Sequence, residues 1–270
     1  MPKNNFSRKS ALLGALCAVL LLGLLYAGLH FAGLTSPVAE PFRFEGAGSD
    51  SPEAAAQAYI EGLRNADLDQ MLRAFAVETY AAHYDLESMI RRMQSWSPAI
   101  EYLPDGREPF ARLNLLNRVS EIRRQIRRQI LILLELESWN GTEIGSIIMT
   151  DDEQIREFME TFDPDLSKLE TLSVLEILEP EDLGDALGDP GLSERYHSQT
   201  NQNNLTRQME FTNADDWRHL TAHIGWDGEE YYLFFELLRY GGQWYVGGFS
   251  GNLGHLMGLS STAGGLAKAP

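Results

Sequence analysis

Glu236 is the acidic residue best placed to do chemistry. It lies in the apolar run Tyr232 to Tyr240, with Phe234 and Leu238 two positions away on either side. Residues two apart in a strand share a face, so this carboxylate would be surrounded by apolar side chains. Such surroundings raise the pKa of a carboxyl group and allow it to act as a general acid or base. The alternative is that Glu236 faces solvent or pairs with an arginine.

A second set of candidate residues is suited to binding rather than reacting. Aromatic residues concentrate in the last third of the chain, after Trp217. Aromatic side chains line many small-ligand pockets, although the same residues also fill the cores of sheets. The weak pocket candidates on this reasoning are Trp217, His223, Tyr232, Phe234 and Trp244.

The sequence predicts no metal site and no cofactor. His219 and His223 would share one face of a strand but stand about 13 Å apart along it, too far to bind one ion. No glutamate lies between them in a His-Glu-x-x-His arrangement. The single cysteine, Cys17, lies near the N-terminus, which excludes a thiolate zinc site in the rest of the chain. Walker loops, dinucleotide-binding glycines and Gly-x-Ser-x-Gly elbows are also absent from the sequence.

A group of arginines lies in the segment from Pro109 to about Leu136, whose apolar residues recur at helical spacing. We place these arginines on the polar side of the helix, where they would either pair with the chain's many acids or form a docking patch. They are Arg118, Arg123, Arg124, Arg127 and Arg128.

An apolar stretch near the N-terminus predicts a membrane anchor. Residues 11–34 contain no charged side chain, and as a helix they would extend about 36 Å, enough to cross a hydrocarbon core. Lys3, Arg8 and Lys9 precede the stretch, so residues 1–10 should stay in the cytoplasm and the rest of the chain should lie outside. A cleaved signal peptide is the alternative, but this stretch is long for one and lacks a good small-x-small cleavage site.

The chain after this stretch is strongly acidic. The whole chain carries a formal charge of −17, and since residues 1–34 contribute three positive charges, the remainder carries −20. Such a surface repels nucleic acid, so we expect no nucleic-acid partner. The charge favours solubility in the first place, and basic partners or cations in the second.

Local patterns predict an α+β domain after a linker over 35–50. Ser51 and Pro52 are typical of a helix start, and further helices are expected from Asp67, over about 78–94, within 109–136 and from about 150 to 162. A strand is expected within 169–178 and a weak helix over 193–209. Three strand-like runs joined by Asp227-Gly228 and Gly241-Gly242 predict an antiparallel meander up to residue 250. Residues 251–270 are rich in Gly and Ser and are expected to form a short helix and a loose tail.

Both ends of this domain resemble the nuclear-transport-factor-2-like superfamily. The matching residues are Ser51-Pro52-Glu53-Ala54-Ala55, Tyr59 to Leu63 and Asn65 to Leu68 at the start, and Tyr232 to Phe235 with Tyr240 to Val246 at the end. The resemblance implies helices packed on a curved antiparallel sheet with a pocket at its wide end, but no single function. Residues 98–216 depart from it, so either 98–168 is a helical insertion or the α+β fold is unrelated.

The sequence leaves two classes of function open. The first is a non-catalytic binding or interaction module of unknown ligand, tethered by residues 11–34 to the outer face of a cell membrane. The alternative is a pocket enzyme of isomerase or dehydratase type that uses Glu236, and a carrier with the same pocket but no acid or base is a weaker third. A buried cavity with at least one convergent titratable group would favour the enzyme, and a filled sheet face would favour the interaction module.

Overall fold

The computed structural model describes residues 43–97, 101–104, 106–134, 149–256 and 264–269. The predicted spanning segment, residues 11–34, lies outside these ranges. Within them, no helix combines the length and the apolar character that a membrane crossing requires.

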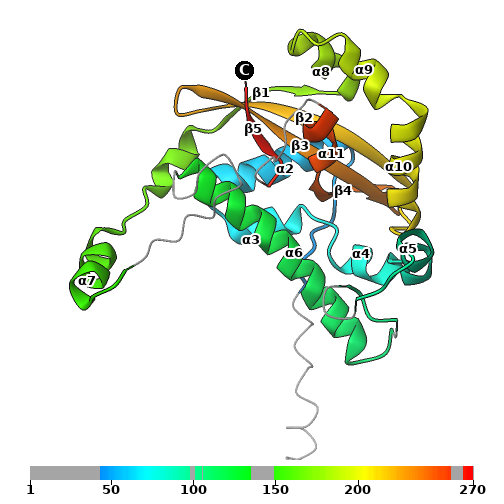
Figure 1. The fold of residues 1–270 in the computed structure, drawn as a ribbon, viewed down its shortest axis with the longest axis horizontal. Helices are drawn as coiled ribbons and strands as arrows, with labels where there is room; N and C mark the ends of the chain where they lie inside the picture. The colour runs from blue at the N-terminus through cyan, green and yellow to red at the C-terminus, as the bar shows by residue number, and fades with distance from the viewer. Residues whose placement is uncertain (1–42, 98–100, 105, 135–148, 257–263, 270) are drawn as a thin grey trace, which may run out of the picture. The chain divides into compact units, whose positions relative to one another are not determined.

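The fold is α+β, with helices packed on a curved antiparallel sheet (Figure 1). The helices are α2 (Pro52–Arg64), α3 (Leu68–Arg73), α4 (Glu78–His83), α5 (Leu86–Met93), α6 (Phe110–Leu133), α7 (Asp152–Thr161), the 3₁₀ helix η1 (Leu166–Thr171), α8 (Pro180–Ala186), α9 (Gly191–Tyr196), α10 (Gln199–Glu210) and α11 (Gly251–Leu256). The strands are β1 (Ser173–Leu178), β2 (Asp216–Trp226), β3 (Glu229–Tyr240), β4 (Gln243–Phe249) and β5 (Leu266–Lys268).

The predicted meander is present as β2, β3 and β4. The strand order is β1-β2-β3-β4, and β5 pairs with the first half of β3. Both hairpin turns place two residues in the left-handed region, with φ of +48° and +79° at Asp227 and Gly228 and of +57° and +85° at Gly241 and Gly242. These conformations match the right-handed twist of the strands, which is why Asp-Gly and Gly-Gly favour them.

The larger core lies on the face of the sheet that carries Leu220 of β2 and Leu233 and Phe235 of β3. Helix α2 covers this face, and Tyr59, fully buried, contacts Phe235 edge to face with ring centroids 5.9 Å apart. Helix α6 contributes to the same core, so it is not the centre of a separate subdomain. Its buried contributions are Ile122, Ile126 and Leu133.

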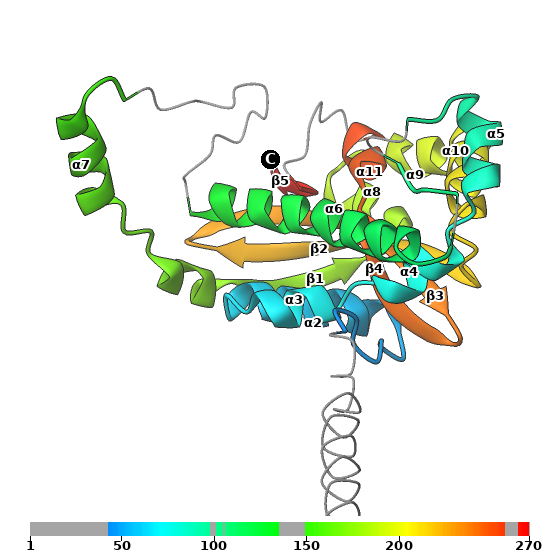
Figure 2. The same ribbon diagram turned by 90° about the horizontal axis from the view of Figure 1, so that it is seen from below.

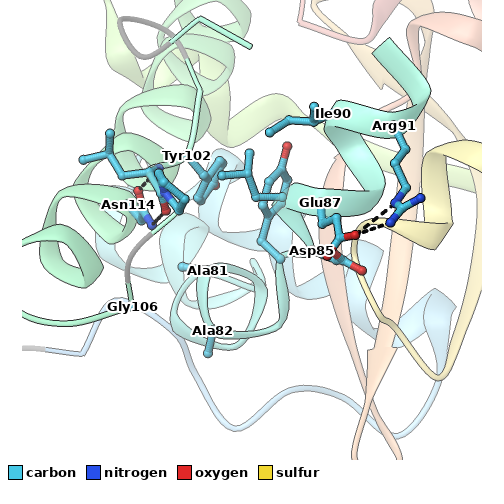
Figure 3. A pocket seen from close by; sticks show the side chains of 13 residues that line it. Ala81, Ala82, Asp85, Glu87, Ile90, Arg91, Tyr102, Gly106 and Asn114 are labelled. Atoms are coloured by element: carbon cyan, nitrogen blue, oxygen red, sulfur yellow. Dashed lines mark hydrogen bonds and ion pairs between the residues drawn. The ribbon is translucent and has the colours of Figure 1, made fainter. Parts of the chain in front are cut away.

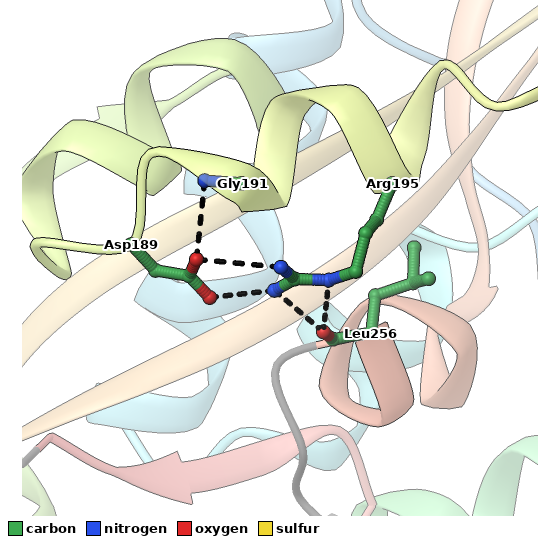
Figure 4. Close-up of polar contacts among 4 residues, drawn as sticks. All are labelled: Asp189, Gly191, Arg195 and Leu256. Atoms are coloured by element: carbon green, nitrogen blue, oxygen red, sulfur yellow. Dashed lines mark hydrogen bonds and ion pairs between the residues drawn. The ribbon is translucent and has the colours of Figure 1, made fainter.

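The opposite face of the sheet is also covered, which explains why the consecutive residues 231–235 of β3 are all buried. Tyr232 and Phe234 pack there against α8, α9 and α11. Figure 4 shows how α9 is joined to α11: Arg195 of α9 pairs with Asp189 and donates hydrogen bonds to the carbonyl oxygen of Leu256 at the end of α11, from Nε at 3.3 Å and Nη2 at 3.1 Å.

Several helices differ from the expectation. The helix expected over 78–94 is two helices, because the chain breaks at Tyr84 and the Asp85 carboxylate starts α5 by accepting a hydrogen bond from the Ser88 amide at 3.0 Å. The polar stretch 180–212 contains α8, α9 and α10 rather than one weak helix. Residues 266–268, expected within a loose tail, form β5.

The last part of the expected linker is packed on the domain. The buried Glu45 carboxylate accepts hydrogen bonds from the amides of Val77 at 2.7 Å and Thr79 at 2.9 Å, at the start of α4. In return, Glu78 accepts hydrogen bonds from the amides of Phe44 at 2.8 Å and Glu45 at 3.0 Å. This reciprocal arrangement, a capping box assembled between distant segments, fixes the chain to α4 from residue 44 onward. We call it the Glu45–Glu78 clamp.

Candidate functional site

A cavity of about 370 Å³ lies beside Glu236. Its floor is formed by β3 and β4, and its walls come from α4, α5, α6 and the end of α10. Four of the polar side chains that line it come from four different elements: Tyr80, Arg92, Gln125 and Glu236. The apolar lining consists of Met209, Phe211, Leu238 and Phe249. We call this space the Glu236 cavity.

Glu236 is partly buried between Phe234 and Leu238, as its neighbours in the strand predict. Burial raises the pKa of its carboxyl group, and the positive charge of Arg118 opposes that shift. No hydrogen bond joins this carboxylate to another residue of the described chain. A carboxyl group in this state can accept a hydrogen bond from a ligand, or exchange a proton with it.

His219 is the direct neighbour of Glu236 on β2, because the strand register pairs these two residues. Paired side chains on one face of a sheet lie close together. The imidazole is 2% exposed, and burial lowers the pKa of His219 to about 4, so it is neutral at pH 7. Its Nδ1 lies 3.3 Å from the hydroxyl of Tyr196, in the wall of a smaller cavity of about 240 Å³. Glu236 therefore lines one cavity, and its strand neighbour His219 lines the other.

Arg118 supplies the positive charge near Glu236. Its side chain is buried and lies over the ring of Tyr80, with the guanidinium carbon 3.9 Å from the ring centroid. Nε donates a hydrogen bond to the carbonyl oxygen of Ala76 at 3.2 Å, and Nη2 donates to that of Gly247. Glu121 adds a longer ion-pair contact at 3.8 Å. These contacts leave Arg118 committed to the protein, so it acts as a fixed counter-charge.

A β-bulge opens the space above Glu236. Glu236 pairs with Gly248 and Leu237 pairs with Val246, so Gly247 is the extra residue on β4. The bulge exposes the Gly247 carbonyl to Arg118, and Gly248 places no side chain beside Glu236. Bulges with glycine are typical of places where a strand must bend or where a ligand approaches closely.

The bulge gives a test of how the cavity is held open. A Cβ at Gly247 would lie 2.6 Å from Cγ of Leu238, so we expect Gly247→Ala to push Leu238 into the cavity and to lower the free energy of unfolding by about 1 to 3 kcal/mol. Chemical denaturation would measure the loss. Gly106→Ala is the control, since a Cβ there would meet nothing within 4 Å. Equal stability of the two variants would contradict this account of the bulge.

A larger hollow of about 680 Å³ lies between α4, α5 and the start of α6 (Figure 3). Its polar groups are mostly satisfied by one another. Asn114 exchanges two hydrogen bonds with the backbone of Leu103, at 2.8 and 3.0 Å, and Arg91 pairs with Glu87. The buried hydroxyl of Tyr102 has no hydrogen-bond partner within the described ranges, but no charged group is left uncommitted beside it. We therefore place the candidate site at the smaller Glu236 cavity.

The five aromatic and histidine candidates do not gather around Glu236. Tyr232 and Phe234 are buried under α8, α9 and α11. His223 stacks on Tyr232 and pairs with Glu230 at 2.8 Å. Trp244 belongs to the larger core, and Trp217 lines the smaller cavity beside His219. The described residues contain no group of three or more side chains suited to hold a metal ion.

The expectation that Arg118 lies on the polar side of its helix is wrong. Arg118 precedes Ile122 and Ile126 at four-residue intervals and shares their buried face, whereas Leu113 and Leu116 are 49% and 48% exposed. Arg123, Arg124 and Arg127 are exposed and form no ion pair with the rest of the described chain. Tyr80, Arg92 and Gln125 were missed as site residues; the adjacent glycines 247 and 248 within a strand were the available signal for the cavity.

Comparison with known proteins identifies no family. No family model matches the chain, and no curated protein matches it in sequence. Among solved structures, the chain is similar to a cystatin-like protein from Ruminococcus gnavus ATCC 29149, with 12% identity and a TM-score of 0.44. The match covers 86% of this chain but 44% of that protein, so the chain spans less than half of its length. A likeness of this size carries no information about function.

Proposed function

We propose that this chain is a membrane-tethered, extracytoplasmic module that binds a small ligand in the Glu236 cavity. The observation that carries the proposal is the Glu236 carboxylate, which faces the cavity without a hydrogen-bond partner in the described ranges. A volume of about 370 Å³ lies in the range of small-molecule pockets, in which convergent polar groups fix the orientation of the ligand. A pocket of this kind beside a curved sheet is also what membership of the nuclear-transport-factor-2-like superfamily would imply.

Ligand screening with a matched pair of variants tests the binding function. The full-length chain in detergent would be screened against a panel of small metabolites by thermal shift. We expect at least one compound to raise the melting temperature of the wild type and of Glu170→Gln, which changes an exposed carboxylate in η1, but not of Glu236→Gln. The binding proposal fails if no compound has this effect, or if every stabilising compound acts equally on Glu236→Gln.

The location outside the cytoplasm rests on the charge pattern around residues 11–34. Fractionation followed by protease treatment of intact cells tests it. The chain should sediment with membranes, and the acidic domain should be digested without lysis. A soluble, unprocessed chain in the cytosol would rule out the tether.

An acid–base enzyme is the second candidate, because burial raises the pKa of Glu236 and so makes its carboxyl group better suited to proton exchange. The two candidates differ in the fate of the ligand. A binding module returns the ligand unchanged, whereas an isomerase or dehydratase converts it. Conversion by the wild type that is lost in Glu236→Gln would establish the enzyme.

A further inference from the structure

Apart from the hydroxyl of Tyr80, the uncommitted polar groups of the Glu236 cavity are of two chemical kinds. At the sheet, Glu236 offers a carboxylate, and Oε1 of Gln125 is buried without a hydrogen-bond partner among the described residues. Both are hydrogen-bond acceptors, and an unsatisfied buried acceptor is costly unless a ligand or water donates to it. These two acceptors are therefore suited to a hydrogen-bond donor, above all to an ammonium group.

The outer end of the cavity has the opposite character. Arg92 of α5 is exposed, and its guanidinium carbon lies 5.6 Å from the ring centroid of Phe211. It forms no ion pair with any other residue in the described part of the chain, although the domain is rich in acids. Arginine binds carboxylates with a planar pair of donors, so this end is suited to a carboxylate.

Four apolar side chains also line the cavity. Met209 and Leu238 are almost fully buried, and Phe211 and Phe249 complete the lining. A ligand that joins the two ends must therefore carry a short hydrocarbon segment between its charges. We assign Arg118 no role in recognition, because its Nε and Nη2 donate to backbone carbonyls and its Nη1 lies 3.8 Å from Glu121.

We propose that the Glu236 cavity binds an elongated zwitterion, with its ammonium group on Glu236 and Gln125 and its carboxylate on Arg92. This proposal rests on the binding function proposed above and names its ligand class. It predicts that tight binding requires both charges on one molecule, and that a different side chain binds each charge.

Calorimetry on the full-length chain with three probes tests the proposal. Aminocaproate carries both charges, hexylamine only the ammonium and hexanoate only the carboxylate. We expect aminocaproate to bind at least about tenfold more tightly than either other probe, since each charge-assisted contact contributes to affinity. Glu236→Gln should weaken aminocaproate and hexylamine by about tenfold and leave hexanoate unchanged. Arg92→Gln should weaken aminocaproate and hexanoate and leave hexylamine unchanged.

The neighbouring arginine provides the control. Arg91 lies on the same helix but pairs with Glu87 outside the cavity, so Arg91→Gln should leave all three affinities unchanged. Equal binding of the three probes, or equal effects of both cavity variants on all of them, overturns the zwitterion. If aminocaproate fails to bind while another compound still depends on Glu236, the ligand class is wrong and the binding function stands. If no compound depends on Glu236, both proposals fall.

Discussion

Replacing Arg118 with methionine should lower the free energy of unfolding by about 3 to 5 kcal/mol, the range for breaking a buried, hydrogen-bonded charge site. The substitution would leave the carbonyl oxygens of Ala76 and Gly247 buried without their donor. It would also remove the cation from the face of Tyr80 and the counter-charge from Glu236. Methionine fills a similar length, so most of the loss would come from these polar groups rather than from a void.

Urea denaturation followed by tryptophan fluorescence would measure this loss. Arg123→Met is the matched control, because Arg123 is exposed on the same helix, and it should change stability by no more than about 0.5 kcal/mol. Arg118→Lys should fall between the two, since lysine keeps the charge but cannot bridge two carbonyls with a planar fork. A loss below about 1 kcal/mol for Arg118→Met would show that α6 does not depend on this residue.

Replacing Glu236 with glutamine should instead stabilise the protein near neutral pH, by about 1 kcal/mol. The folded state raises the pKa of this carboxyl group above the ordinary value of 4.5. Folding therefore favours the protonated form, and the stability this supplies is present at low pH and is lost as the pH rises through the folded-state pKa. Glutamine is uncharged at every pH, so the variant avoids the cost of burying a negative charge and its stability does not depend on the titration of this side chain.

The pH dependence is the sharper part of this prediction. The advantage of Glu236→Gln over the wild type should be full above the folded-state pKa and should vanish below about pH 4.5, where the carboxyl is protonated in both states. The groups that face it are the same in both proteins: Arg118 keeps its positive charge, and Tyr80 stays neutral because burial raises the pKa of its phenol. Glu170→Gln should show no such trend. Destabilisation at pH 7, or a difference that does not change with pH, would contradict the prediction.

The parts of the fold that could be predicted are those set by neighbouring residues. Ser51 caps α2 by accepting a hydrogen bond from the Ala54 amide at 3.2 Å, and the two hairpins follow from their turn residues. The division of 78–94 into two helices could not be predicted in the same way, because α4 begins at a cap supplied by Glu45 from a distant segment. Local patterns contain no information about such partners.

The candidate site also contains one residue that could be predicted from its sequence neighbours and one that could not. Glu236 could be selected because the apolar neighbours that raise its pKa are its neighbours in the strand. Arg118 could not, because its role depends on α6 crossing close to a bulge in β4 more than a hundred residues later, and its charge suggests a solvated position. Its spacing from Ile122 and Ile126 was the usable signal: an arginine in register with a buried stripe is held there by specific partners.

If residues 11–34 anchor the chain as proposed, the Glu45–Glu78 clamp limits the distance between the domain and the membrane. Since the chain is held to α4 from residue 44, only residues 35–43 of the sequence separate this point from the apolar stretch. A fully extended segment of this length would span at most about 30 Å, which is comparable to the thickness of the bilayer core. In that case the domain stays close to the membrane surface, and it would bind solutes that are present there rather than throughout the compartment.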